Sequence, residues 1–434
     1  MQSNNIAFCQ RPPMGWNSWD CFGASVTEEE VRQNARYMAQ HLKAFGWEYV
    51  VVDIQWYEPT ADGSVYHPFA NLAMDEFGRL IPAENRFLSS KGGKGFAPLA
   101  DYVHELGLKF GIHIMRGIPR QAVHQNTPVL GTDVRARDIA HPYSICPWNT
   151  DMYGIAQGKP GAQAYYRSIV ELYASWCVDF LKVDDISYTD FGKDPYAGRG
   201  EIEMLRRAID ECGRDMVLSL SCGPAPIEQA THLQANANMW RLTADLWDRW
   251  EDIEPMFEKC AQWQPFAVQG HWPDADMLPL GHLSVRGSEH GVTERICRLT
   301  QAEQCSMMTL WCIARSPLMM GGSLTDLSPE TQKLLTNPHA LAMNQGNQKA
   351  CQVMRCGYND ACVLWRSQGD ADYIALFNTW NVDARFELDF GKLGLSKSTV
   401  LLDVWNDVIE TTHGDIFPMT LPIHGCRLFK VVNP

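Results

Sequence analysis

The first three-quarters of the chain alternates between helix-type and strand-type hydrophobic patterns. Thr27 and Glu30 form a capping box, and the apolar residues that follow share one helical face, namely Val31, Ala35, Met38 and Leu42. Residues 49–54 are then predicted to form a buried strand. Similar helices around 165–176 and 202–209 lead into strands at 180–184 and 216–221. Continuous apolar strands after amphipathic helices indicate a parallel sheet that is covered by helices.

The same pattern places eight strands, near residues 15–19, 49–54, 109–114, 180–184, 217–221, 239–243, 266–270 and 316–320. Eight such units predict an α/β fold with a closed (β/α)8 TIM barrel, and we assign residues 1–343 to this catalytic domain. The polar residues of chemical interest fall at or just after the C-terminal ends of these strands. That rim carries the chemistry in (β/α)8 barrels.

From residue 344 onward the pattern changes to short strands. Segments at 363–365, 373–377, 400–405 and 427–432 have the pattern of strands, and turn-rich pieces such as 381–383 and 412–415 separate them. No convincing helix pattern lies between these segments. Residues 344–434 are therefore expected to form a small antiparallel β-sandwich.

The net charge and the aromatic content indicate which kinds of molecule the protein binds. The 434-residue chain is 45% hydrophobic and 20% charged, with a formal net charge of −14. This acidity argues against nucleic acid, whose binding needs a clustered positive surface, and it fits a small neutral carbohydrate. Fifteen Trp and fourteen Tyr exceed ordinary core needs, and flat aromatic rings stack on the C–H faces of sugars. Most of these rings are nevertheless expected in the interior.

The fourteen cysteines are scattered and form no metal-type C-x-x-C pair, which favours free thiols over disulfides. The first residues lack the apolar core of a signal peptide, and no later segment reaches transmembrane length. We therefore expect a cytoplasmic protein that has no association with membranes.

The strand at 180–184 ends in two carboxylates beside a lysine. Side chains alternate along a strand, so Lys182 and Asp184 point the same way, toward the barrel mouth. A cation two residues away keeps Asp184 ionised, as a nucleophile requires. Asp184 is therefore the candidate nucleophile. The alternative is an acid at the rim whose salt bridge orders a loop.

A second acid, Asp245, follows the sixth strand, with Arg241 and aromatic residues nearby in the sequence. An apolar wall would raise the pKa of its carboxyl group, as a general acid needs near neutral pH. The stretch also fits a helix N-terminus that Asp245 caps. Two acids on separate strands favour the catalytic interpretation, because glycoside hydrolysis needs carboxylates on both sides of the scissile bond.

A third group lies around the seventh strand, where Asp274 and Asp276 share one side if the chain stays extended. Paired acceptors suit sugar hydroxyls and also a divalent cation. No nearby His or Glu has ligand spacing, so we expect no metal and no cofactor. His113, near the end of the third strand, is a candidate sugar contact, although a lone His is more often a hydrogen-bonded packing residue.

These segments together resemble glycoside hydrolase family 27, which contains α-galactosidases and α-N-acetylgalactosaminidases. The barrel motifs are Pro-Pro-Met-Gly-Trp-Asn-Ser-Trp at 12–19, Lys-Val-Asp at 182–184, Arg-x-x-x-Asp-x-x-Asp at 241–248, Gly-x-Trp-x-Asp-x-Asp-Met-Leu at 270–278, Ser-Pro-Leu at 316–318 and Asn-Gln at 344–345. Asp-Val-Trp at 403–405 and Leu-Pro-x-His-Gly-Cys at 421–426 extend the similarity to the end of the chain. The cysteine pattern of secreted members is not evident, which suggests a bacterial-type cytoplasmic branch.

The resemblance implies an exo-glycosidase that removes a terminal sugar by double displacement with net retention. Asp184 would attack the anomeric carbon while Asp245 protonates the leaving oxygen and later deprotonates water. By position in the motifs, the residues that bind the sugar are Trp19, Asp53, His113, Lys182, Cys222, Arg241 and Asp276, with Trp19 stacked on its apolar face. His113 stands where many members carry a sugar-contacting Tyr.

Two departures from the family pattern concern the identity of the sugar. α-Galactosidases end the second strand with two Asp residues that bind hydroxyls at the O4 and O6 end of galactose, whereas this chain has Asp53 followed by Ile54. After Ser221 and Cys222, the loop that reads C2 has small or compact residues at 223–226. Such residues leave room for a 2-acetamido group, or they have a backbone reason alone. We expect an α-N-acetylgalactosaminide or an α-galactoside as substrate.

Several alternatives stay open. Cleavage of β-L-arabinopyranosides, whose ring is the same but lacks C6, and of isomalto-type α-glucosides is consistent with Ile54. A non-catalytic sugar-binding barrel and a metal-dependent barrel hydrolase are different classes of function. The loop at 115–120 has no obvious family counterpart, and its Arg116 and Arg120 are expected to pair with surface acids rather than to reach the substrate.

Overall fold

The structure is a computed structural model that describes residues 9–189, 193–286 and 293–433. Eight parallel strands form its central sheet in the order β10-β9-β8-β7-β3-β2-β1-β13. Leu278 closes this sheet, because its N–H donates to the carbonyl of Met319 (2.8 Å) and its carbonyl accepts from the N–H of Gly321 (3.0 Å). The predicted (β/α)8 barrel is confirmed. Its strands are β1 (Met14–Asn17), β2 (Tyr49–Val52), β3 (Lys109–Met115), β7 (Phe180–Asp184), β8 (Val217–Leu220), β9 (Met239–Arg241), β10 (Trp272–Asp274) and β13 (Leu318–Met320).

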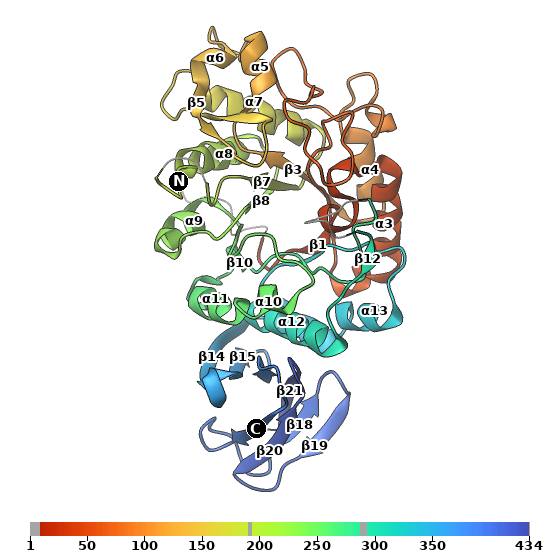
Figure 1. The fold of residues 1–434 in the computed structure, drawn as a ribbon, viewed down its shortest axis with the longest axis vertical. Helices are drawn as coiled ribbons and strands as arrows, with labels where there is room; N and C mark the ends of the chain where they lie inside the picture. Colours follow the sequence, from red (N-terminus) through yellow and green to blue (C-terminus); the bar gives the residue numbers. More distant parts are fainter. Residues whose placement is uncertain (1–8, 190–192, 287–292, 434) are drawn as a thin grey trace.

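Helices cover the outside of the barrel (Figure 1). The predicted capping box begins α3 (Glu28–His41), where the Thr27 N–H donates to Glu30 Oε2 at 2.8 Å. The four residues predicted to form the inner face of this helix are all buried. The other helices are α2 (Trp19–Phe22), α4 (Ala97–Glu105), α7 (Ala162–Ser175), α8 (Arg199–Glu211), α9 (Ala230–Asn236), α10 (Trp250–Ile253), α11 (Met256–Trp263), α12 (Gln301–Ala314), α13 (Pro329–Leu335) and α14 (Pro338–Gln345).

The seventh barrel strand lies further along the chain than the predicted range 266–270. Residues 264–266 form a 3-10 helix that contains Pro265, and Gly270 has a φ of +88°, so the chain turns before β10 begins. β10 has only three residues, too few for a hydrophobic pattern to define it. Beyond β10 the chain is not extended, because Asp276 has a φ of +83°. The condition for Asp274 and Asp276 to share one side, an extended chain, is therefore not met.

A small subdomain, which the hydrophobic pattern did not predict, interrupts the barrel between β3 and β7. It contains α5 (Arg120–Gln125), α6 (Ala136–Ile139) and a three-stranded antiparallel sheet of β4 (Ile118–Pro119), β6 (Met152–Ile155) and β5 (Ala140–Ile145). Figure 1 shows it at the end of the molecule opposite the C-terminal domain. A second small sheet pairs β11 (His282–Leu283) with β12 (Arg295–Ile296).

The C-terminal domain is an antiparallel β-sandwich, as predicted. Its larger sheet has the order β14-β15-β16-β21-β18-β19, and its smaller sheet pairs β17 with β20. One face of the larger sheet packs on the smaller sheet, and the other face packs on the barrel helices, where Trp405 Nε1 donates to Thr309 Oγ1 on α12 at 2.8 Å. The strands are β14 (Gln348–Cys356), β15 (Cys362–Gly369), β16 (Asp372–Asn378), β17 (Ala384–Asp389), β18 (Val400–Asp403), β19 (Val408–Thr411), β20 (Ile416–Leu421) and β21 (Cys426–Asn433).

All fourteen cysteines are free thiols. Within the described ranges, none of the helices has both the length and the apolar character needed to cross a membrane.

Candidate active site

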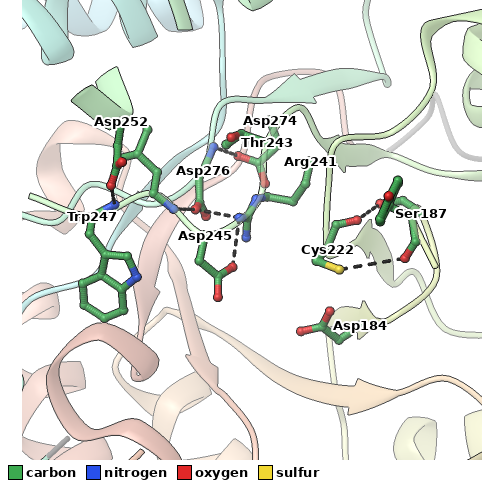
Figure 2. Close-up of polar contacts among 12 residues, drawn as sticks. Asp184, Ser187, Cys222, Arg241, Thr243, Asp245, Trp247, Asp252, Asp274 and Asp276 are labelled. Atoms are coloured by element: carbon green, nitrogen blue, oxygen red, sulfur yellow. Dashed lines mark hydrogen bonds and ion pairs between the residues drawn. The ribbon is translucent and has the colours of Figure 1, made fainter. Parts of the chain in front are cut away.

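The structure gathers the predicted site residues at one end of the barrel. Each lies in the last residues of a barrel strand or in the segment that follows it, and the set comprises Trp19, Asp53, His113, Lys182, Asp184, Cys222, Arg241, Asp245 and Asp276. Figure 2 shows the carboxyl groups of Asp184 and Asp245 facing the same space at the barrel mouth. Burial raises the pKa of the Cys222 thiol, and the charges of both acids raise it further. In Figure 2 the two acids face one space, although they are 61 positions apart in sequence (184 to 245).

Asp184 is held by two donors at the end of β7. His113 Nε2 lies 3.1 Å from Asp184 Oδ2, and the N–H of Asp185 donates to Asp184 Oδ1 at 2.7 Å. Burial raises the pKa of the Asp184 carboxyl group, but His113 and Lys182 outweigh burial and bring this pKa to about 2. Asp184 is therefore ionised at neutral pH, which is the state that a nucleophile requires.

Lys182 makes its hydrogen bond with Asp53 rather than with Asp184. Its Nζ lies 2.8 Å from Asp53 Oδ2, and Asn17 Nδ2 donates to the same oxygen at 2.6 Å. Burial raises the pKa of Asp53, and the charges of Lys182 and His113 lower it by more. Asp53 is thus a fixed anion with two oriented oxygens, and Lys182 acts on Asp184 through its charge.

Arg241, at the end of β9, links the candidate acid/base to the seventh strand. Its Nη2 lies 3.0 Å from Asp245 Oδ1 and 2.7 Å from Asp276 Oδ2 (Figure 2). The side chain of Asp245 is 56% exposed, whereas those of Arg241 and Asp276 are buried. Since α10 begins only at Trp250, the alternative that Asp245 caps a helix is wrong. An exposed carboxyl group opposite Asp184 can exchange a proton with an incoming oxygen.

The two carboxyl oxygens of Asp276 have different surroundings. Oδ2 accepts from the Leu246 N–H at 2.7 Å in addition to its ion pair, and buried Oδ1 has no hydrogen-bond partner in the described part of the chain. Burial raises the pKa of Asp276 above its usual range, and the charges of Asp245 and Asp274 raise it further, against the stabilising charge of Arg241. The free oxygen is available to a sugar hydroxyl.

Trp19 and Cys222 complete the predicted set. The Trp19 ring stacks on Tyr66, with ring centres 5.8 Å apart and an interplanar angle of 13°. Tyr66 in turn contacts Trp148 at 5.7 Å. Sequence reasoning missed both Tyr66 and Trp148, because they lie in loops without a recognisable motif. Cys222 Sγ donates to the Tyr188 carbonyl at 3.8 Å, which leaves the thiol as a small wall residue of the site.

Arg116 pairs with buried acids. The expectation that it pairs with surface acids is therefore wrong. Its side chain is 2% exposed and forms ion pairs with Asp185 Oδ2 (2.8 Å) and Glu201 Oε1 (3.0 Å). Its backbone N–H also donates to the Asp184 carbonyl at 3.1 Å. Since the N–H of Asp185 holds the Asp184 carboxylate, Arg116 fixes the turn that orients the candidate nucleophile. Arg120 instead lies over the Tyr153 ring, 4.7 Å from its centre.

Replacing Arg116 by Met is expected to destabilise the protein by about 3–5 kcal/mol, because Asp185 and Glu201 would remain buried without their cation. Urea denaturation of Arg116→Met measures this loss. The matched control is Arg167→Met, which removes an ion pair with Glu211 whose side chains are 45% and 42% exposed and should cost less than about 1 kcal/mol. Equal, small losses in both variants would contradict this account of Arg116.

The described residues contain no group of three or more His, Cys, Asp or Glu side chains that could hold a metal ion. Four carboxylates at the barrel mouth are already paired with His113, Lys182 or Arg241, namely Asp53, Asp184, Asp245 and Asp276. Such carboxylates can exchange protons and can accept hydrogen bonds from hydroxyl groups.

A barrel with separate carboxylates at its mouth and aromatic rings beside them defines a sugar-cleaving hydrolase, and comparisons with known proteins agree. A family model described as alpha galactosidase A matches residues 150–346. The structure of a family 27 β-L-arabinopyranosidase from Geobacillus stearothermophilus is 54% identical, with a TM-score of 0.96 and coverage of 100% of this chain and 99% of that one. The chain belongs to glycoside hydrolase family 27.

Two further relatives differ in the sugar that their names give. An α-N-acetylgalactosaminidase-like protein from Bacillus halodurans is 50% identical, with a TM-score of 0.85 and 97% of each chain covered. Alpha-galactosidase 3 from Arabidopsis thaliana is 26% identical over 443 residues, covering 100% of this chain and 84% of its own. A variant of the Geobacillus enzyme, 53% identical to this chain, has been solved in complex with arabinose.

Proposed function

We propose that the protein is a retaining exo-glycosidase whose preferred substrates are terminal β-L-arabinopyranosides. The observation that carries this proposal is Ile54, a residue 2% exposed that directly follows the sugar-binding candidate Asp53. A family 27 α-galactosidase has a second Asp at this place to bind hydroxyls at the C6 end of galactose. L-Arabinopyranose presents the same ring without C6, so a hydrocarbon side chain suits it better than a carboxylate does. The 54% identity with the Geobacillus β-L-arabinopyranosidase supports this choice.

The proposed reaction has two displacements. Asp184 attacks the anomeric carbon as the bond from this carbon to the leaving oxygen breaks, and Asp245 gives its proton to that oxygen. Asp245 then takes a proton from water, whose oxygen attacks the same carbon and releases Asp184. The low pKa of Asp184, about 2, supports its role as nucleophile and as leaving group in the second step. Two inversions give net retention.

N-acetylgalactosaminides are the second candidate, because of the small residues after Cys222. For one of these small residues, Gly223, the structure gives a reason that does not involve the substrate. A Cβ on Gly223 would lie 2.4 Å from the carbonyl oxygen of Thr243 and 2.7 Å from that of Arg241. Glycine is required there by the close approach of two backbones, which weakens the argument for a space shaped around a 2-acetamido group.

A panel of nitrophenyl glycosides tests the proposal. We expect kcat/KM for the β-L-arabinopyranoside to exceed that for the α-D-galactopyranoside, the α-N-acetylgalactosaminide and the α-glucoside by at least about tenfold, since one missing hydroxyl contact has this scale of effect. Preference for the α-galactoside would refute the assignment of the sugar. No turnover of any glycoside would favour a non-catalytic sugar-binding barrel.

A further inference from the structure

Asp20 is a buried acid at the barrel mouth that the proposed reaction does not use. It follows Trp19 on α2 and is 2% exposed. Its Oδ2 is fully buried, and no hydrogen bond to its carboxyl group occurs among the described residues. Asp53, Asp184 and Asp276 each accept hydrogen bonds from a cationic side chain, a backbone N–H or both. Among the described acids of this site, Asp20 is therefore the one whose carboxyl group has no hydrogen-bond partner on either oxygen.

The position of the Asp20 carboxyl group is fixed by close packing. A Cβ on Gly321, the residue after β13, would lie only 1.9 Å from Asp20 Oδ2. The Asp20 carbonyl accepts from the Ser284 N–H at 2.8 Å, which anchors the backbone of α2. The group thus lies against the end of the eighth barrel strand, on the rim that carries the other site residues.

The electrostatic surroundings of Asp20 are those of the site itself. Burial raises its pKa well above the usual range, and the charges of Asp276, Asp245 and Asp53 raise it further, against the opposing charge of Lys182. Lys182 lies in the fourth barrel strand, and the three acids follow the second, sixth and seventh strands, so charges from four strands act on Asp20. In its neutral form the carboxyl group both donates and accepts a hydrogen bond.

We propose that Asp20 is a further substrate-binding residue, whose carboxyl group hydrogen-bonds a ring hydroxyl of the pyranose held between Asp184 and Asp245. A buried polar group without a partner is costly, and a sugar hydroxyl would remove this cost only in the complex. This inference rests on the proposed glycosidase function but not on the identity of the sugar. The proposed role of Asp20 also explains the glycine at position 321, because a Cβ there would displace the Asp20 carboxyl group.

The test is a double-mutant cycle between Asp20→Ala and the 2-, 3- and 4-deoxy forms of the nitrophenyl glycoside that the panel shows to be cleaved fastest. We expect Asp20→Ala to lower kcat/KM about 10- to 100-fold on the parent glycoside. We also expect one deoxy form to be cleaved poorly by the wild type yet to suffer almost no further loss in Asp20→Ala. Exposed Asp101→Ala on α4 is the control, with unchanged kinetics.

Two further variants keep the test decisive if Asp20→Ala folds poorly. Asp20→Asn keeps a hydrogen-bond donor and an acceptor and should retain most activity. Gly321→Ala keeps the Asp20 side chain but displaces its carboxyl group. This second variant should show the same selective coupling to one hydroxyl as Asp20→Ala. Equal proportional losses on all deoxy forms, or a kcat/KM within twofold of the wild type in Asp20→Ala and Gly321→Ala, would overturn the proposal. Because the cycle uses the best glycoside of the panel, a wrong sugar assignment leaves this test intact.

Discussion

Asp184→Asn is expected to lower kcat by at least about a thousandfold while the protein stays folded. The amide has nearly the shape of the carboxylate, but it lacks the negative charge that attacks the anomeric carbon. Its carbonyl oxygen can still accept the N–H of Asp185, which donates at 2.7 Å in the wild type. Steady-state kinetics on the preferred nitrophenyl glycoside, with circular dichroism as the check on folding, measures the effect.

The matched control for this prediction is Asp179→Asn, which lies just before the other end of the same strand. Asp179 pairs with His104 at 2.7 Å and with Arg214 at 2.5 Å on the rim opposite the site. Residues on that face of a (β/α)8 barrel support stability rather than chemistry. We therefore expect a lower melting temperature and a nearly unchanged kcat. Similar losses of kcat in both variants would show that Asp184 acts on the fold and not on the reaction.

Ile54→Asp is expected to shift the ratio of kcat/KM for α-galactoside over β-L-arabinopyranoside by about 100-fold toward galactose. The new carboxylate would bind hydroxyls at the C6 end of galactose, and it would stand unpaired when arabinose leaves that place empty. The measurement is the specificity ratio from both nitrophenyl substrates, since a ratio cancels any loss of folded enzyme.

Ile54→Val is the control, because it keeps the apolar surface and removes one methylene from a buried residue. We expect its specificity ratio to stay within a few-fold of the wild type. If Ile54→Asp leaves the ratio unchanged, Ile54 does not face the C6 end of the sugar, and the arabinopyranoside assignment loses its main support.

The barrel could be predicted because its strands and helices have strong hydrophobic periods. Strand β7 matches its predicted range 180–184, since five apolar or rim-facing residues follow a clear helix. β10 was misplaced because three residues carry too little pattern, and Pro265 and Gly270 mark turns that the apolar residues around them conceal. The subdomain between β3 and β7 was missed because its strands pair residues that are distant in sequence, such as Ile118 with Tyr153.

The site residues could be predicted where a charged residue ends a predicted barrel strand, as for Asp184 and Arg241. Partners across the barrel were harder to assign. The sequence places Lys182 two residues from Asp184, yet its hydrogen bond goes to Asp53, which follows a strand two places away in the sheet. Asp20 carries no sequence signal either, because only its packing against Gly321 shows that the carboxyl group is confined and unpartnered.

The most direct test of the central claim is to trap the covalent intermediate. A slow fluorinated glycoside of the preferred sugar, followed by proteolysis and tandem mass spectrometry, identifies the residue that carries the sugar. We predict a single adduct on the peptide that contains Asp184, located on that residue. A sugar attached to Asp245, or no adduct together with NMR detection of the inverted anomer as product, would contradict the two-carboxylate account of this site.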